Sequence, residues 1–178
     1  MSAPEPGPGL VQVYTGDGRG KTTSALGQAL RAAGHGLPVY IIQFMKGWPH
    51  YGELAALQHQ PGITLRQFGR AGFVDRQHPE PIDVQMAQEA LAHARQVVQT
   101  GAHSLVILDE INVALDWGLV ALEDVLHLIA ERPRHVELVL TGRGAPAELI
   151  AVADLVTEMR EIKHPYQQGI VSRRGIDY

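Results

Sequence analysis

One segment of the sequence carries residues arranged for phosphate chemistry: a glycine-rich loop that ends in Gly-Lys-Thr and directly follows an apolar run. Alternating glycines let backbone N–H groups turn toward an anion without Cβ clashes. Lys21 adds a positive charge for the distal phosphates, and the hydroxyl of Thr22 stands where a Mg²⁺ ligand is needed. We therefore predict that the loop binds a nucleoside triphosphate through Gly16, Asp17, Gly18, Arg19, Gly20, Lys21, Thr22 and Thr23.

This loop departs at one position from the full phosphate-binding pattern, which has glycine where the chain has Thr15. The alternative interpretation is a glycine-rich turn between a strand and a helix that binds nothing. We favour nucleotide binding because strand, loop, Lys-Thr and helix follow one another in the required order. The helical segment 24–33 also directs the positive end of its dipole toward the loop. The motif indicates a nucleotide and a metal, but it does not indicate a reaction.

Composition limits the class of protein. With 178 residues, of which 45% are hydrophobic, the chain is long enough for one domain with its own core. A net charge of −4 argues against a nucleic-acid partner, whose binding surface is normally basic. Because cysteine is absent, the chain forms no disulfide, thiolate metal site or thiol redox couple. We recognise neither a signal peptide nor a membrane-spanning apolar run, so we expect a cytoplasmic protein without membrane contact.

Short apolar runs alternate along the chain with longer segments of helical spacing. The short runs, each bounded by turn residues, are 11–14, 39–44, 63–68, 105–108, 136–140 and 155–159. The clearest helical segment begins near Pro81 and repeats apolar residues from Ile82 to Val98. This alternation and the P-loop predict an α/β fold, a P-loop NTPase-like (RecA-like) three-layer sandwich with a mostly parallel sheet. We expect one domain, residues 10–178, after a flexible tail, residues 1–9, that is rich in Pro and Gly.

Two adjacent carboxylates, Asp109 and Glu110, follow the apolar run 105–108. Ligands of parallel sheets gather at the carboxyl ends of strands, and in P-loop proteins an acidic residue there completes the Mg²⁺ environment. Because side chains alternate along a strand, we expect one carboxylate to face the metal and the other to orient backbone. We predict that Thr22, Asp109 and Glu110 surround Mg²⁺ or Mn²⁺. An ordinary polar strand end is the alternative.

Other charged residues lie where they could contact ligands. Lys46 and Arg143 follow two further apolar runs, and each could neutralise a ligand phosphate, carboxylate or amide or could be solvated surface charge. Arg31 lies ten positions beyond Lys21, about 15 Å along a helix, so we expect it to reach a different part of the bound ligands. The nine histidines show no spacing typical of metal ligands.

Four segments together resemble the ATP:corrinoid adenosyltransferases. They are Thr15 to Thr23, Gln-Phe-Met-Lys-Gly at 43–47, Gly-Arg-Ala-Gly-Phe-Val at 69–74 and Leu-Asp-Glu-Ile-Asn-Val-Ala-Leu at 108–115. The likeness continues through 140–143, 163–166 and the ending Gly-Ile-Asp-Tyr at 175–178, so it covers nearly the whole chain after the tail. The P-loop is generic, whereas Leu-Asp-Glu-Ile-Asn and Gly-Ile-Asp-Tyr are much more specific. Thr15 in place of glycine also matches this family's loop. The resemblance implies that residues 10–178 bind both nucleotide and corrinoid.

The resemblance implies that the chain transfers the 5′-deoxyadenosyl group of ATP to the cobalt(I) of a corrinoid, in adenosylcobalamin biosynthesis or salvage. The cobalt attacks the ribose 5′ carbon and the whole triphosphate leaves. That leaving group concentrates negative charge, which Mg²⁺, Lys21 and the loop amides would stabilise. Because cobalt(I) is itself a strong nucleophile, no protein base is needed, and the sequence offers no Ser/His/Asp arrangement.

The resemblance also implies a catalytic role for Phe73. Cobalt(II) with axial ligands resists reduction, and the family presses apolar side chains against one corrin face to remove an axial ligand. Some members use both aromatic residues of a Gly-Phe-Thr-Trp segment, which here reads Gly72-Phe-Val-Asp75. Phe73 is retained, but Asp75 replaces the tryptophan. Either Phe73 works with another hydrophobic residue or this branch handles the corrinoid differently. A core or loop anchor is the alternative for Phe73.

Two other functions use the same loop. A small-molecule kinase or phosphohydrolase would release ADP, and a non-catalytic corrinoid or ATP carrier would release nothing. The resemblance implies a homodimer, and the absence of cysteine points to an external electron donor such as a flavoprotein. The sequence leaves open whether the acceptor is complete cobalamin or an earlier corrinoid.

Overall fold

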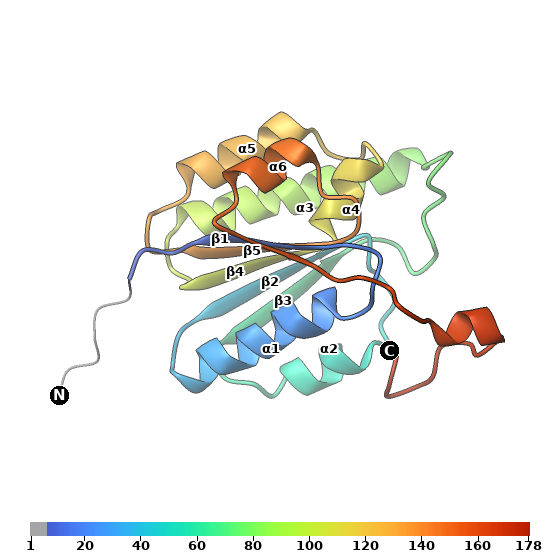
Figure 1. Cartoon of the computed structure of the whole chain (residues 1–178). Coiled ribbons are helices and arrows are strands. Elements are labelled where there is room, and N and C mark those ends of the chain that lie inside the picture. Colours follow the sequence, from blue (N-terminus) through green and yellow to red (C-terminus); the bar gives the residue numbers. More distant parts are fainter. Residues whose placement is uncertain (1–6) are drawn as a thin grey trace.

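A computed structural model describes residues 7–178 of the chain. Six strands form one parallel sheet in the order β3-β2-β4-β5-β1-β6, and helices cover both of its faces (Figure 1). The predicted three-layer α/β sandwich of P-loop NTPase-like type is thereby confirmed. The predicted tail lies mostly outside the described residues. At its end, the Gly9 N–H donates to the carbonyl of Arg134. The division into a tail and one domain stays a prediction.

Each strand coincides with one of the six apolar runs to within one residue at either end. The strands are β1 (Val11–Thr15), β2 (Val39–Phe44), β3 (Ile63–Phe68), β4 (Leu105–Asp109), β5 (Glu137–Thr141) and β6 (Leu155–Glu158). β2, β4 and β5 are nearly continuous buried runs, because helices cover both faces of the sheet centre. β6 is an exposed edge strand.

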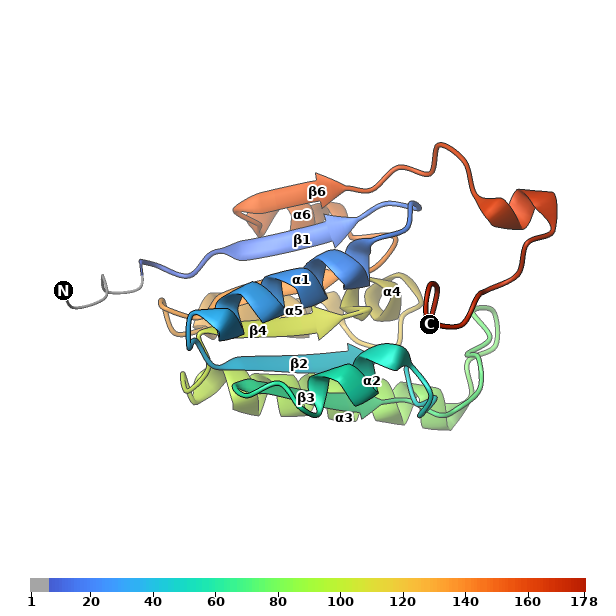
Figure 2. The same cartoon turned by 90° about the horizontal axis from the view of Figure 1, so that it is seen from below.

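The helices divide between the two faces. They are α1 (Lys21–Gly34), α2 (Gly52–Leu57), α3 (Pro81–Gln99), α4 (Ile111–Asp116), α5 (Leu122–Glu131) and α6 (Ala147–Val152), with a short 3₁₀ helix η1 (Pro165–Gln168). α1 and α2 cover one face, and α3 to α6 cover the other (Figures 1 and 2). No helix within residues 7–178 is long and apolar enough to span a bilayer.

Side chains alternate between the two faces of the sheet along each strand, so a separate hydrophobic core forms on each face. Ile41 and Ile107 pack with Ala29 of α1, whereas their neighbours Ile42 and Leu108 belong to the larger core under α3 and α5. All five residues are fully buried. Burying each large aliphatic side chain contributes about 1.5–3 kcal/mol, so the central strands are held rigidly from both sides.

The predicted helix at Pro81 is α3, with proline in its first turn and a reciprocal capping box between Glu80 and Asp83. Ile82, the first apolar residue of the predicted segment, is 42% exposed, and the buried residues of the helix begin with Asp83. Asp83 occupies the buried position, because its carboxylate caps the helix and binds the guanidinium of Arg70.

The carboxyl ends of the strands lie at one edge of the sheet, where the loop between β1 and α1 also begins. β5 separates β1 from β4 in the sheet. Its last residue, Thr141, therefore stands between the P-loop and Asp109, the last residue of β4. This order decides which side chains meet at the site.

Candidate nucleotide and metal site

The loop between β1 and α1 wraps around the ammonium group of Lys21, the first residue of α1. Lys21 Nζ donates to the carbonyl oxygens of Gly16, at 2.6 Å, and Gly18, at 2.7 Å. Gly16 and Gly20 have φ values of 90° and 119°, which glycine adopts freely. Burial lowers the pKa of Lys21, and the positive charge of Arg143 lowers it further. The loop is thus a closed cradle whose cation can exchange loop carbonyls for phosphate oxygens.

Asp109 is buried at the centre of a polar cluster. Its Oδ1 accepts hydrogen bonds from the hydroxyls of Thr22, at 2.8 Å, and Thr141, at 2.7 Å. Its Oδ2 accepts from the ammonium of Lys46, at 2.7 Å, and the side-chain amide of Gln43, at 3.1 Å. Burial alone would raise the pKa of Asp109, but the charge and hydrogen bond of Lys46 and the two hydroxyl bonds hold it below its ordinary value. The cluster therefore favours an ionised carboxylate.

Glu110 leaves the strand through a left-handed backbone, with φ 67°. Its N–H donates to Thr141 Oγ1 at 3.1 Å. Burial raises the pKa of Glu110, and the negative charge of Asp109 raises it further. The two adjacent carboxylates thus have different environments, and Asp109 is the one in contact with Thr22.

Two residues with a strained backbone lie at or beside the charged residues of the site. Among residues 7–178, only Met45 and Glu110 combine a non-glycine side chain with positive φ. Each such residue costs about 1–3 kcal/mol and persists where surrounding structure enforces it. Met45 directly precedes Lys46, where the chain packs backbone to backbone against the end of β3, so that a Cβ atom on Gly47 or Gly69 would overlap the facing main chain. These glycines allow the approach that turns Lys46 inward.

The donor set fits a hard divalent cation. Thr22, Asp109 and Glu110 offer hydroxyl and carboxylate oxygens, the ligands that Mg²⁺ prefers. Across residues 7–178, no three His, Asp or Glu side chains lie close enough to hold a metal ion by themselves. Mg²⁺ commonly binds through one or two carboxylates together with substrate phosphates. The site therefore suits a metal that binds with a nucleotide.

Phe73 lies on a loop, residues 69–80, that joins β3 to α3 and that we call the Phe73 loop. Its side chain is fully exposed, which excludes the core anchor considered as an alternative. Arg70 forms two parallel bonds to the carboxylate of Asp83, at 2.7 and 2.8 Å, and Arg76 pairs with Asp116 of α4 at 3.2 Å. Ion pairs thus tie the loop to α3 and α4 and leave Phe73 free for a contact outside the chain.

Asp75 has a local structural role in the Phe73 loop. Its Oδ1 accepts the N–H of Gln77 at 2.8 Å, and its Oδ2 lies 3.7 Å from Nδ1 of His78. The hydrogen bond from Gln77 above all, with smaller effects of His78, lowers the pKa of Asp75. A carboxylate here caps a turn, which an aromatic residue cannot do.

Other residues predicted to bind ATP are spread over the loop and α1. Asp17 and Thr23 are exposed beside the loop. Arg31 lies in the last turn of α1, at the far end from Lys21, so the structure does not bring it to the cradle. Arg19 points away from the cradle and pairs with Asp177 near the end of the chain, at 2.5 Å.

Sequence reasoning left the role of Lys46 open and assigned none to Thr141 or Gln43. The side chain of Lys46 is mostly buried, pairs with Asp109 and is not a solvated surface charge. Arg143, its counterpart after β5, is exposed. Thr141, like Asp109, is a polar residue directly after an apolar run, and this position could have marked it as a site residue. The sequence does not give the strand order that brings the two residues together.

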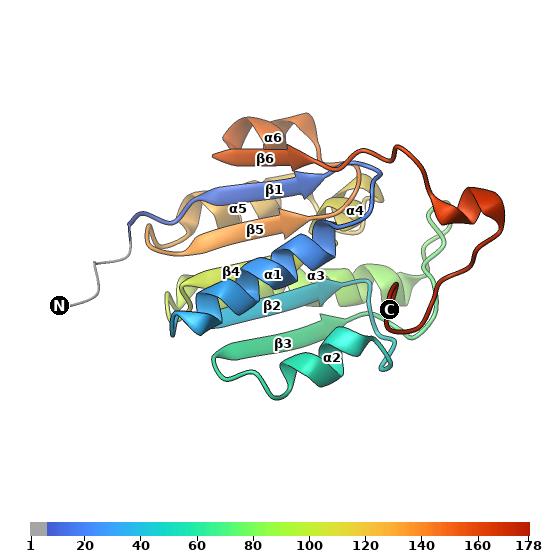
Figure 3. The same ribbon diagram turned by 60° about the horizontal axis from the view of Figure 1, so that its bottom comes forward.

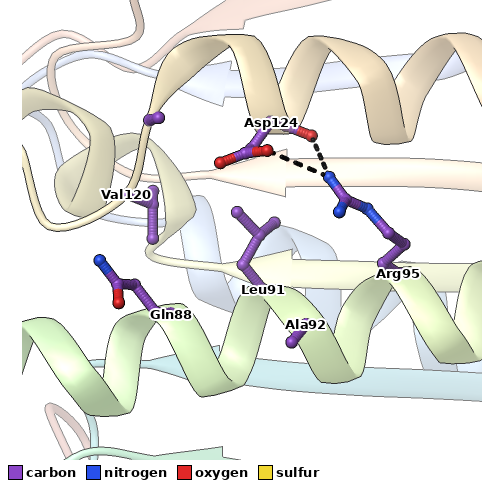
Figure 4. Close-up of a pocket in the computed structure, with 7 residues that line it drawn as sticks. Gln88, Leu91, Ala92, Arg95, Val120 and Asp124 are labelled. Atoms are coloured by element: carbon purple, nitrogen blue, oxygen red, sulfur yellow. Dashed lines mark hydrogen bonds and ion pairs between the residues drawn. The ribbon is translucent and has the colours of Figure 1, made fainter.

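A pocket of about 290 Å³ lies between α3 and α5, on the face opposite α1 (Figure 4). Leu91 and Val120 line it, and Arg95 Nη2 bridges to Asp124 Oδ1 at 3.3 Å along one side. None of the predicted site residues lines this pocket, which is separate from the P-loop edge.

A parallel α/β sandwich with Lys21 in a glycine-rich loop and Asp109 beside Thr22 defines a P-loop nucleotide-binding protein. Within that class, the chain belongs to the ATP:corrinoid adenosyltransferase family, BtuR/CobO/CobP, whose family model matches residues 8–178. It is 37% identical over 172 residues to the corrinoid adenosyltransferase of Sinorhizobium sp, covering 96% of this chain and 80% of that protein. The corrinoid adenosyltransferase of Escherichia coli K12 is 36% identical over 171 residues, covering 96% and 86%. That of Pseudomonas aeruginosa is 37% identical over 170 residues, covering 96% and 84%.

Proposed function

We propose that this chain catalyses the reaction for which its family is named, by joining the 5′ carbon of ATP to the cobalt(I) of a corrinoid and releasing intact triphosphate. The observation that carries the proposal is the family match across residues 8–178. The contact of Thr22 with Asp109 adds a physical basis, because it links the P-loop to the acidic strand end.

In this reaction the cobalt(I) electron pair forms the cobalt–carbon bond, and the carbon–oxygen electron pair leaves with the triphosphate. Lys21 and the N–H groups of the loop offset the charge that develops on the leaving oxygens. Thr22, Asp109 and Glu110 would hold Mg²⁺ or Mn²⁺, which supplies further charge stabilisation to the triphosphate when bound. Lys46 keeps Asp109 ionised and oriented. Catalysis then consists of positioning and charge stabilisation, without a protein base.

Product analysis tests the proposal. Chemically reduced cobalt(I) corrinoid and MgATP are incubated with the protein without oxygen, and the phosphate products are separated. We expect one triphosphate for each adenosylated corrinoid. ADP would indicate the kinase or phosphohydrolase, and an absence of product would indicate the carrier.

Lys21→Ala is the matching variant, and it should abolish turnover while circular dichroism shows an intact fold. Arg134→Ala removes an exposed cation from the connection before β5, away from the P-loop edge, and should leave turnover unchanged. Near-normal adenosylation by Lys21→Ala would rule out its role at the phosphates.

Three associated expectations rest on sequence and family alone. A homodimer is proposed from the family resemblance, and size-exclusion chromatography with light scattering tests it. An external electron donor such as a flavoprotein is proposed because the chain contains no cysteine. The cytoplasmic location also stays a prediction.

A further inference from the structure

The last six residues, 173–178, fold into a compact structure that we call the C-terminal turn. Gly175 N–H donates to the Tyr178 carbonyl and Asp177 N–H to the Arg173 carbonyl, both at 2.8 Å. The carboxylate of Asp177 accepts from the main-chain N–H of Arg173 at 2.8 Å and from its guanidinium at 3.0 Å. Residues 173–177 of the turn are exposed and Tyr178 is partly buried, so polar bonds and not a hydrophobic core give the turn its shape.

This turn bridges two loops at the carboxyl edge of the sheet. On one side, Arg19 of the P-loop pairs with Asp177 at 2.5 Å and donates to the carbonyl oxygen of Ile176. On the other side, the Tyr178 ring lies edge-on to Trp48, with centroids 5.1 Å apart, in the loop between β2 and α2. Figure 3 shows the chain end beside that loop.

The chain leading to the turn also braces the P-loop from outside. Gly18 N–H donates to the carbonyl oxygen of Met159 at 2.6 Å, directly after β6. A Cβ atom on Gly18 would lie 2.7 Å from that oxygen, so only glycine fits this approach. The loop conformation therefore depends on contacts at two points of the C-terminal segment.

Arg19 is one position before Gly20, yet its guanidinium faces the C-terminal turn and not the cradle around Lys21. Asp177 is held between two guanidinium groups, and bonds from Arg173, with a smaller effect of Arg19, lower its pKa to about 2. The carboxylate is thus ionised at neutral pH and available to Arg19. In this geometry Arg19 positions the loop through the turn.

We propose that the C-terminal turn is a clasp on the P-loop, closed by Arg19 and Asp177, and that MgATP binding and clasp docking stabilise each other. The inference rests on the proposed nucleotide site. We expect the coupling because a single conformation of the P-loop binds both MgATP and the C-terminal turn. In that conformation the inner face of the loop faces the triphosphate, and Arg19 faces the turn. By linkage, each binding event then favours the other to the same degree.

A double-mutant cycle on MgATP affinity tests the coupling, with corrinoid omitted so that no turnover occurs. Calorimetry should give about five- to tenfold weaker MgATP binding for Arg19→Ala and for Asp177→Asn, at the low end of typical site-to-site coupling. The double variant should be no weaker than the weaker single variant, because both changes open the same clasp. Asp177→Glu should restore most of the affinity. Arg174→Ala, in the same turn, should have none of these effects, since among residues 7–178 Arg174 forms no ion pair.

Tryptophan fluorescence reports the docking itself. The chain has two tryptophans, so Trp117→Phe leaves Trp48 as the single probe. Tyr178→Ala calibrates the open clasp, and we expect red-shifted Trp48 emission. Asp177→Asn should show part of that shift, and saturating MgATP should reverse it.

Each remaining outcome overturns the inference. Fully additive losses from Arg19→Ala and Asp177→Asn would assign Arg19 to direct phosphate contact. If MgATP causes a red shift of Trp48 emission in the Trp117→Phe protein that retains Arg19 and Asp177, nucleotide binding opens the clasp. Equal MgATP affinity in all variants would refute the clasp alone, whereas a wild-type chain that binds no MgATP would refute both the clasp and the proposed function.

Discussion

Replacing Lys46 by methionine should destabilise the protein strongly, although the change keeps most of the side-chain volume. Lys46 is 14% exposed and Asp109 2% exposed at the side chain, and their charged atoms are 2.7 Å apart. Removing one partner of a buried ion pair costs about 3–5 kcal/mol, because the other charge stays buried without compensation. Here the hydroxyls of Thr22 and Thr141 still solvate Asp109. We therefore expect a loss of about 2–4 kcal/mol in the free energy of unfolding.

Urea unfolding followed by circular dichroism at neutral pH, without divalent cations, measures this loss. The matched control is Lys163→Met, the same substitution at an exposed position, which should change stability by less than about 0.5 kcal/mol. Adding Asp109→Asn to Lys46→Met should recover much of the stability, since the double variant buries no unpaired charge. A loss below about 1 kcal/mol, or no recovery in the double variant, would refute the assigned ion pair.

The pH dependence has a definite sign. In the wild type the pKa of Asp109 is lower when folded than when unfolded, so its stabilising effect is present above the unfolded pKa and is lost as pH falls through the folded pKa. Without Lys46, burial is the main influence left and raises the folded pKa of Asp109. Acid then stabilises the Lys46→Met variant relative to the wild type. The difference between the two should shrink from pH 7 to pH 4, and a constant difference would contradict the mechanism.

Two further predictions concern the proposed reaction. Glu110→Gln removes a charge while keeping the shape, and it should raise the Mg²⁺ concentration needed for half-maximal adenosylation. An unchanged Mg²⁺ requirement would move the role to Asp109, which contacts Thr22, or to no carboxylate. Phe73→Ala should slow the reaction that starts from cobalt(II) far more than the one that starts from cobalt(I), while urea unfolding stays unchanged, because the side chain is fully exposed. Equal losses from both starting states would reject the ligand-displacement role implied by the family.

The order of strands and loops along the chain followed from the sequence, because apolar runs of four to six residues between turn signals are short enough to be strands. The P-loop also followed from the sequence, because the residues that define it are adjacent in the chain. Contacts between distant segments did not. Lys46 and Asp109 meet only because β2 lies beside β4, and Arg19 meets Asp177 only because the chain returns across the sheet edge. Hydrophobic periodicity encodes neither neighbour relation.

Strand order also explains why one carboxylate, and not its neighbour, lies at the centre of the site. β5 stands between β1 and β4, so Thr141 reaches the same oxygen of Asp109 that Thr22 contacts from α1. Lys46 approaches the other oxygen from the loop after β2. Two hydroxyls and one ammonium, from three separate segments, thus fix the rotamer of Asp109. Glu110 turns out of the strand, and among residues 7–178 its hydrogen bonds are those of its main chain, to Thr141 and Ala114, so its carboxylate remains free to respond to a ligand. We therefore expect the fixed carboxylate to orient the P-loop threonine and the free one to supply charge to a bound cation.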